Sequence, residues 1–413
     1  MTGRAEGLTA YIAVTAAYWA FMLTDGALRM LVLLHFHTLG FSPVQLAYLF
    51  VLYEIAGVVT NLCAGWIAAR FGLTSTLYAG LSLQVLALLA LSQLDPNWGI
   101  GLSVAFVMAV QGASGVAKDL SKMSAKSAVK VLAPSGQGGL FRWVAVLTGS
   151  KNAVKGFGFL LGAVLLAAWG FVPSVLGMAA ILFVILCAVI WKMPSGLPKG
   201  KKGTKFGDIF ATTSNVNWLS AARVFLFGAR DVWFVVGIPI YFYAVLSDGS
   251  EAGNRQAFFM IGSFMAVWTI LYGFVQANAP KLLRANTRSE AELIAAAQTW
   301  VIALTIIPAV LAVVLWGVGA SFGTTVMLVL GLLLFGAIFA VNSSLHSYLI
   351  LAFTSGERVT MDVGFYYMAN AGGRLLGTVL SGLSYQIGGV SACLATASMM
   401  LAFSALAAGR LQR

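Results

Sequence analysis

Two lysines and an asparagine stand inside one of the long apolar stretches of the chain. Lys151, Asn152 and Lys155 fall within the run from Leu140 to Trp169, which at about thirty residues exceeds the roughly twenty that a helix needs to cross a bilayer. Lys151 and Lys155 are four residues apart and share a helix face. Two like charges on one face are costly to bury in lipid, so an anion must compensate them. A carboxylate on another helix could do so, but an anionic ligand that arrives and leaves is the better explanation.

Charged and amide side chains recur near the middle of other apolar runs. In chain order they are Asp25, Arg29, Glu54, Arg230, Asp231, Asn342, His346, Asn370 and Arg374. Together with the two lysines they make five cations and three carboxylates, an excess of two positive charges. Arginine binds phosphate-like oxygens through a two-pronged fork and lysine supplies a mobile point charge, so a multiply charged oxyanion fits this set. We expect Lys151, Lys155, Arg230 and Arg374 to converge at mid-depth, with Arg29 nearby.

Local spacing suggests which of these charges pair. Asp25 and Arg29 are four residues apart and could neutralise each other instead of binding a ligand. Arg230 and Asp231 are adjacent and point to different helix faces, so we expect them not to pair. Glu54 has no cation within one helical turn in the sequence. It is therefore the strongest candidate to carry a coupling proton, with Asp25 and Asp231 as the other carboxylates available for coupling.

A second group of basic residues falls nearer the membrane surface. Lysines at 118, 122, 126 and 130 form one basic stripe if the fourth apolar run continues as a helix beyond the membrane. The stripe either contacts anionic lipid or acts as an electrostatic funnel, and Lys118 and Lys122 are close enough for the second role. Arg223 is expected to be a gate residue at the same side. His346 is either a packing residue, the more common case, or a proton carrier.

The composition excludes several function classes. Of 413 residues 60% are hydrophobic and only 9% are charged, against about 25% charged in soluble proteins, and the mean hydropathy is +0.91. The net charge of +12 comes from basic loops between apolar runs, so we expect the lipid bilayer and no nucleic acid as the partner. The cysteines are scattered and no ATP-binding motif occurs, which predicts no metal, no cofactor and no enzyme.

Twelve apolar runs predict an all-α membrane protein with twelve transmembrane helices. They are about Leu8–Leu34, Pro43–Ala69, Thr74–Leu94, Gly99–Ala117, Leu140–Trp169, Pro173–Trp191, Val216–Leu246, Ala257–Ala279, Leu293–Trp316, Thr324–Leu351, Asp362–Tyr385 and Gly389–Ala408. A basic linker at 194–214 separates an N-terminal six-helix bundle, 1–193, from a C-terminal one, 215–413. Lysine and arginine gather in the loops of one side, which predicts that both termini are cytoplasmic.

This layout resembles the major facilitator superfamily. The loop from Gly65 to Gly72 is similar to the superfamily's cytoplasmic signature, with Ala69 in place of the usual acidic residue. A short likeness between the segments 152–156 and 370–374 favours two pseudo-symmetric halves, which place a substrate site at the midplane and operate by alternating access. One arginine in the first helix and one in the seventh, Arg29 and Arg230, resemble the pair with which organophosphate:phosphate antiporters clamp phosphate.

Several stretches resemble one family more closely, the ArsJ organoarsenical efflux permeases. They are 17–32, 34–37, 53–62, 115–130 and 147–153. The resemblance implies a bacterial inner-membrane permease that exports 1-arseno-3-phosphoglycerate and confers arsenate resistance, with a glyceraldehyde-3-phosphate dehydrogenase as the functional partner that makes this arsenate ester. Lysine and arginine suit such a hard oxygen anion, whereas trivalent arsenic would need converging thiolates. An organophosphate or organic-anion exchanger of the same fold is the alternative. A receptor that does not transport would leave the midplane charges without a role.

Overall fold

The computed structural model describes residues 2–132, 139–192, 213–283, 288–354 and 359–412, and within them all regular elements are helices. The first seven are α1 (Thr2–Thr38), α2 (Pro43–Tyr48), α3 (Val51–Leu62), α4 (Ala64–Leu91), α5 (Ile100–Leu132), α6 (Gly139–Trp169) and α7 (Phe171–Lys192). The others are α8 (Ser214–Val232), the π-helix η2 (Trp233–Gly237), α9 (Ile238–Leu246), α10 (Glu251–Leu282), α11 (Glu290–Val318), α12 (Phe322–Ala352) and α13 (Val359–Ala408).

These helices make twelve membrane crossings in the described chain. Eleven stretches are long and apolar enough to span a bilayer, and the last of them, within α13, holds two crossings because Gly388 and Gly389 have non-helical backbone angles. The second crossing combines α2 and α3, and the seventh combines α8, η2 and α9. The predicted number is therefore confirmed. The helix of the second crossing ends at Leu62, with Cys63 as its C-cap, earlier than the sequence suggested, and Gly72 at φ 73° separates the helical piece 64–71 from the third crossing.

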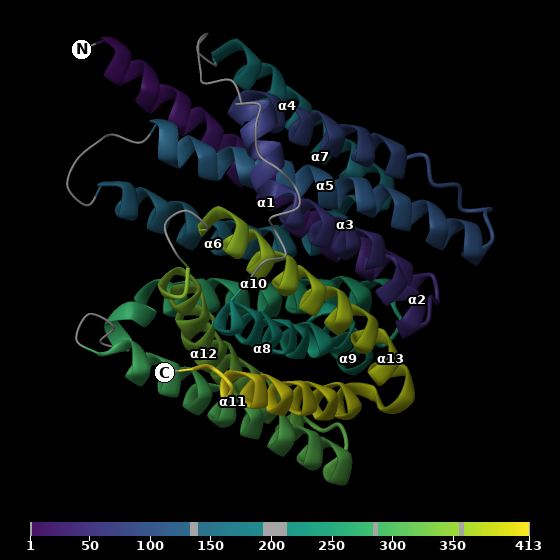
Figure 1. Cartoon of the computed structure of the whole chain (residues 1–413). Coiled ribbons are helices and arrows are strands. Elements are labelled where there is room, and N and C mark those ends of the chain that lie inside the picture. The colour runs from purple at the N-terminus through teal and green to yellow at the C-terminus, as the bar shows by residue number, and fades with distance from the viewer. Residues whose placement is uncertain (1, 133–138, 193–212, 284–287, 355–358, 413) are drawn as a thin grey trace.

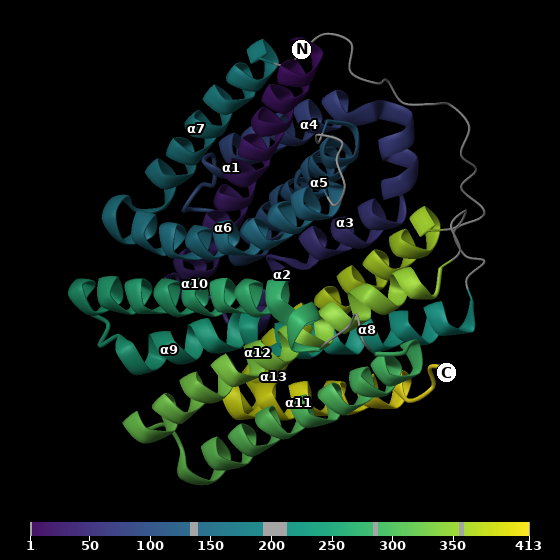
Figure 2. The same cartoon turned by 90° about the vertical axis from the view of Figure 1, so that its left-hand side faces the viewer.

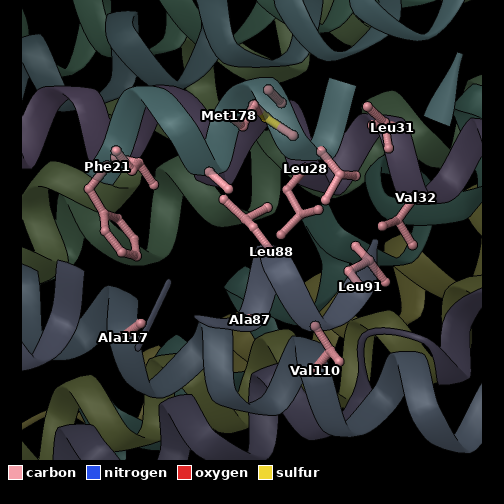
Figure 3. Close-up of a cluster of buried hydrophobic side chains, with 14 of the residues drawn as sticks. Phe21, Leu28, Leu31, Val32, Ala87, Leu88, Leu91, Val110, Ala117 and Met178 are labelled. Atoms are coloured by element: carbon pink, nitrogen blue, oxygen red, sulfur yellow. The ribbon is translucent and has the colours of Figure 1, made fainter. Parts of the chain in front are cut away.

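Two groups of helices lie one above the other (Figure 1). Helices α1 and α3 to α7 fill the upper part and α8 to α13 the lower part, and Figure 2 shows the same division from the side. Phe21 and Leu28 of α1 pack with Leu88 of α4 and Met178 of α7 in the core of the upper group (Figure 3). The predicted linker at 194–214 lies almost wholly outside the described residues, so the domain limits stay a prediction.

Glycines let two pairs of helices approach to backbone distance. A Cβ on Gly158 or Gly162 of α6 would collide with the backbone of α1, and a Cβ on Gly26 of α1 would lie 2.6 Å from the Lys155 carbonyl oxygen. In the same way Gly373 and Gly377 of α13 pack directly against the backbone of α8. Small residues at such crossings are the usual means of close helix packing in lipid. As a result, Asp25 lies beside Lys155 and Asp231 beside Arg374.

Candidate functional site

The first charged group joins α1, α3 and α6. The Nζ atom of Lys155 lies 2.9 Å from one oxygen of Asp25, and the hydroxyl of Tyr53 donates to the other oxygen at 2.6 Å. Lys118 of α5 lies with its Nζ 4.0 Å from the centre of the Tyr53 ring and is itself buried. Asp25 is only 3% exposed, so a bare carboxylate there would be costly without these partners. The pair thus keeps two charges inside the bundle.

A second group connects the upper and lower helices. Glu54 of α3 accepts from Arg29 of α1 at 3.2 Å and from Arg374 of α13 at 2.6 Å, both at the same oxygen. The Nε atom of Arg374 also lies 3.5 Å from Asp231 of α8, whose other oxygen accepts from Arg230 at 2.7 Å. Five side chains from four helices therefore form one ion-pair chain. Arg374 is its centre because it contacts a carboxylate of each group of helices.

These contacts correct three pairings expected from the sequence. Asp25 and Arg29 do not neutralise each other, because the adjacent Tyr53 and Glu54 of α3 separate them, one contacting Asp25 and the other Arg29. Glu54, which has no cation within one helical turn in the sequence, faces two guanidinium groups that come from other helices.

The third correction concerns Arg230 and Asp231, which do pair although they are adjacent. The prediction considered only the direction of the Cα–Cβ bonds. The long arginine side chain reaches around the helix, and the rings of Phe227, Phe234 and Phe339 lie within 5.9 Å of its guanidinium carbon.

The two groups together hold more positive than negative charge. The ion pairs involve four cations, Arg29, Lys155, Arg230 and Arg374, and three carboxylates, Asp25, Glu54 and Asp231. One terminal nitrogen of Arg29 and one oxygen of Glu54 are buried without a hydrogen-bond partner. Buried polar atoms are normally satisfied, so an unpaired nitrogen on a buried guanidinium suits an oxyanion as its missing acceptor.

Lys151 and Asn152 lie nearer the end of the bundle where α6 begins. Both are half-buried, and Lys151 has interaction partners of its own. Asn152 donates from Nδ2 to Gln276 of α10 at 3.0 Å, which is a contact between the upper and lower groups. The sequence analysis did not single out Gln276.

The lysine stripe of α5 is divided between two environments. The helix does continue to Leu132, as predicted. Lys118 lies inside the bundle rather than on a lipid-facing stripe, and Lys122 binds Asn61 at 2.8 Å and the buried Asp119 at 3.5 Å. The side chains of Lys126 and Lys130 lie outside the described part, as do those of Ala69 and Arg70 in the loop motif.

Asp119 anchors a polar cluster that the sequence analysis did not single out. Its carboxylate accepts from Thr60 at 2.6 Å and from Asn61 at 3.3 Å, and the Nζ of Lys122 lies 5.2 Å from the centre of the Tyr367 ring on α13. The residues around Asp119 in the sequence are basic, and the sequence analysis considered only the lysines among them. In the folded protein Asp119 packs against α3 and is only 1% exposed.

The other predicted site residues of the lower group lie between α8 and α13 or on α12. Arg223 of α8 is buried and donates from Nε to Asn370 of α13 at 2.9 Å. Asn342 of α12 donates to the carbonyl of Ala297 on α11 at 3.1 Å, so its amide nitrogen is bound away from the ion-pair chain. His346 of α12 is fully buried and neither ring nitrogen has a hydrogen-bond partner.

The π-helix η2 begins at Trp233, two residues after Asp231. A π-turn leaves backbone groups without their usual helical partners, and here the amides of Val236 and Gly237 both donate to the Ser381 hydroxyl of α13, at 3.1 and 3.3 Å. This locks α8 and η2 against α13 next to the ion-pair chain.

Within the described residues no group of three or more histidine, cysteine, aspartate or glutamate side chains could hold a metal ion.

Comparison with solved structures identifies the fold. The nucleoside transporter NupG shares 16% sequence identity with this chain, with a TM-score of 0.69 and coverage of 98% of both chains. A POT family transporter in complex with 5-aminolevulinic acid shares 13% identity, with a TM-score of 0.70 and coverage of 96% of this chain and 94% of that chain. No family model and no curated protein matches the sequence. The chain therefore has the all-α major facilitator fold and is a multi-pass membrane protein.

Proposed function

We propose that this protein is a secondary transporter that exports an anionic organoarsenical, 1-arseno-3-phosphoglycerate, from the bacterial cytoplasm and so confers arsenate resistance. The ion-pair chain of Arg29, Glu54, Arg374, Asp231 and Arg230 is the observation that carries the proposal. Ionised side chains at membrane depth are expensive and usually mark a transport pathway. Similarity of fold to transporters and the resemblance of the sequence to organoarsenical permeases support it.

In this proposal the substrate replaces carboxylates as the partner of the arginines. Arg374 holds Glu54 and Asp231 in the unloaded protein. An arsenate or phosphate group with several charged oxygens accepts hydrogen bonds from the guanidinium of Arg374 and from the unpaired nitrogen of Arg29. Arg374 thereby loses its contact with Glu54 and contacts the substrate instead. Because α3 and α13 belong to opposite groups of helices, loading weakens one bridge between them, and they rock to expose the site to the other side.

The proposed location is the inner membrane, with both termini in the cytoplasm. Twelve crossings return the chain to the side on which it started, and both ends lie toward the left in Figure 1. The sequence-based topology places on that side the basic stretch Lys118–Lys130, the basic segment 281–288 and the linker, and the positive-inside rule assigns this side to the cytoplasm. The partner enzyme, a glyceraldehyde-3-phosphate dehydrogenase, would make the substrate on the same side.

Growth of arsenic-sensitive bacteria tests this function. Cells that express the protein together with the dehydrogenase should tolerate more arsenate than cells with either alone, whereas tolerance to arsenite should not change. Arg374→Ala, expressed at the same membrane level, is the negative control because it removes the central cation. Protection against arsenite alone, or arsenate protection without the dehydrogenase, would contradict the substrate assignment.

An organophosphate or organic-anion exchanger is the second candidate. Guanidinium forks bind phosphate and arsenate groups alike, since both are tetrahedral oxyanions, and the free cysteines Cys63, Cys187 and Cys393 lie apart in the chain. Proteoliposomes loaded with phosphate separate the two functions. Exchange of labelled 3-phosphoglycerate or glycerol 3-phosphate at high rate, with no export of the arsenate ester from dehydrogenase-containing vesicles, would favour the exchanger.

A further inference from the structure

Arg223 is a buried cation whose known acceptors are all neutral. It is 4% exposed, and its guanidinium donates to the Asn370 side chain and to the carbonyl and hydroxyl oxygens of Ser343 at 2.9, 3.0 and 3.2 Å. In the part of the chain that the structure describes, no carboxylate lies within ion-pair distance of it. By contrast, the four cations of the two charged groups, Arg29, Lys155, Arg230 and Arg374, each contact a carboxylate.

His346 on α12 has no hydrogen-bond partner for its ring. His346 is 0% exposed and both of its ring nitrogens are without a hydrogen bond. It follows Ser343, whose oxygens accept from Arg223, by three residues on α12, so the two residues share one face of that helix. A full positive charge beside two unsatisfied nitrogens is an unfavourable arrangement in a low-dielectric interior unless an acceptor with negative charge binds there.

The side chains around Arg223 hold its planar guanidinium in one orientation. The guanidinium of Arg223 lies between two rings, with its central carbon 3.9 Å from the centre of Phe227 and 4.9 Å from that of Tyr366. Asn370 and Ser343 fix two of its edges by hydrogen bonds. A guanidinium held in this way is ready to present its remaining N–H groups to an oxyanion.

One aromatic ring contacts both this group and the ion-pair chain. The guanidinium carbons of Arg223 and Arg230 are 3.9 and 5.0 Å from the centre of the Phe227 ring, which keeps them within about 10 Å of each other, in agreement with two turns along α8. Asn370 and Arg374 are likewise one turn apart on α13. A small molecule with an anionic group at each end of a three-carbon chain could therefore reach both.

We propose that Arg223, Asn370 and His346 form a second oxyanion subsite that binds the far anionic group of a substrate whose first anionic group is bound by Arg374 and Arg29. The ligand class is a short molecule with two charged oxygen groups, such as two phosphate-like groups or a phosphate and a carboxylate. The subsite presupposes the proposed function, because it serves the same transported anion. It also gives Arg223 a role in binding rather than in gating.

Two commercially available probes test the subsite on the purified full-length protein. 3-Phosphoglycerate carries a phosphate and a carboxylate, whereas glycerol 3-phosphate has the same length and only the phosphate. Calorimetric titration should show that the wild type binds the first more tightly by about tenfold or more, the usual effect of one further charged hydrogen-bonded contact. In Arg223→Gln this preference should disappear while the affinity for glycerol 3-phosphate stays unchanged.

Controls separate failure of the subsite from failure of the proposed function. Arg374→Ala should weaken both probes, and Arg255→Gln, which changes an exposed pair with Glu251 on α10, should weaken neither. An unchanged preference in Arg223→Gln, or an equal loss for both probes, would overturn the subsite. Absence of binding of either probe to folded wild type would instead refute the proposed function.

A second variant covers the case in which Arg223→Gln does not fold. Asn370→Ala removes the oxygen that orients the guanidinium, with no loss of charge, and should also reduce the preference for 3-phosphoglycerate. If size-exclusion chromatography shows Asn370→Ala to be folded and the preference is intact, the subsite is wrong.

Discussion

Replacement of Arg374 by alanine should abolish transport while the protein still reaches the membrane. The side chain contacts Glu54 at 2.6 Å and Asp231 at 3.5 Å. Its removal leaves Glu54 with Arg29 alone, at 3.2 Å, and with an oxygen that already lacks a partner. Removing one partner of a buried charge pair costs about 2–5 kcal/mol. If the substrate uses the same fork, its affinity should fall by about thirtyfold to several thousandfold.

Initial uptake rates into inside-out vesicles, measured against substrate concentration, are the assay. Arg255→Ala is the matched control, because its ion pair with Glu251 is exposed on both sides and surface pairs contribute about 1 kcal/mol or less. It should keep its half-saturating concentration within about twofold. An Arg374→Ala protein that transports with near wild-type affinity would refute the assignment of Arg374 to the substrate.

A double substitution distinguishes lost binding from an unpaired carboxylate. Glu54→Gln combined with Arg374→Ala removes the charge that Arg374 leaves behind, so thermal stability should recover relative to Arg374→Ala alone. Transport should not recover, since the fork is still absent. Recovery of transport in the double variant would mean that Arg374 serves only to neutralise Glu54.

Three further predictions concern single positions. Lys155→Arg should impair transport at normal expression, because the fork cannot occupy the place of the ammonium group 2.9 Å from Asp25; a fully active variant would contradict a role for this lysine. Glu54→Gln should abolish the response of substrate accumulation to an imposed pH gradient, because substrate loading takes Arg374 from Glu54 and lets this carboxylate bind a proton; a normal response would favour exchange for phosphate. Gly162→Ala should destabilise the protein by about 1–3 kcal/mol, seen as a lower melting temperature, because its methyl group meets the backbone of α1 at Ala27. Gly177→Ala, with no atom within 4 Å of the added carbon, should leave that temperature unchanged.

The pseudo-symmetry of the two groups of helices has a structural counterpart in the charged site. In the upper group Asp25 of α1 pairs with Lys155 of α6, and in the lower group Asp231 of α8 lies near Arg374 of α13. Both pairs lie where glycines bring the helices to backbone distance. In the sequence Lys155 and Arg374 belong to two segments that resemble each other weakly. The sequence did not show which carboxylate each of them contacts, nor that Arg374 also contacts Glu54.

What the sequence determined by itself is the number of crossings and the residue types at the membrane midplane. Apolar runs of sufficient length must form helices in lipid, because backbone groups there have no water to bind, and charges such as Lys155 and Arg230 stand out against them. These are local properties, readable from composition and spacing along one helix.

Only the tertiary structure decided which charges meet. Asp25 could have paired with Arg29 on its own helix, yet α3 inserts Tyr53 and Glu54 between them. Burial of Lys118, which spacing placed on a basic stripe that either contacts lipid or acts as a funnel, is likewise decided by α3 and α5 packing together. Side chains of arginine and lysine reach several ångströms from their own helix, so in a medium of low dielectric their partners are set by the neighbouring helices and not by positions along the chain.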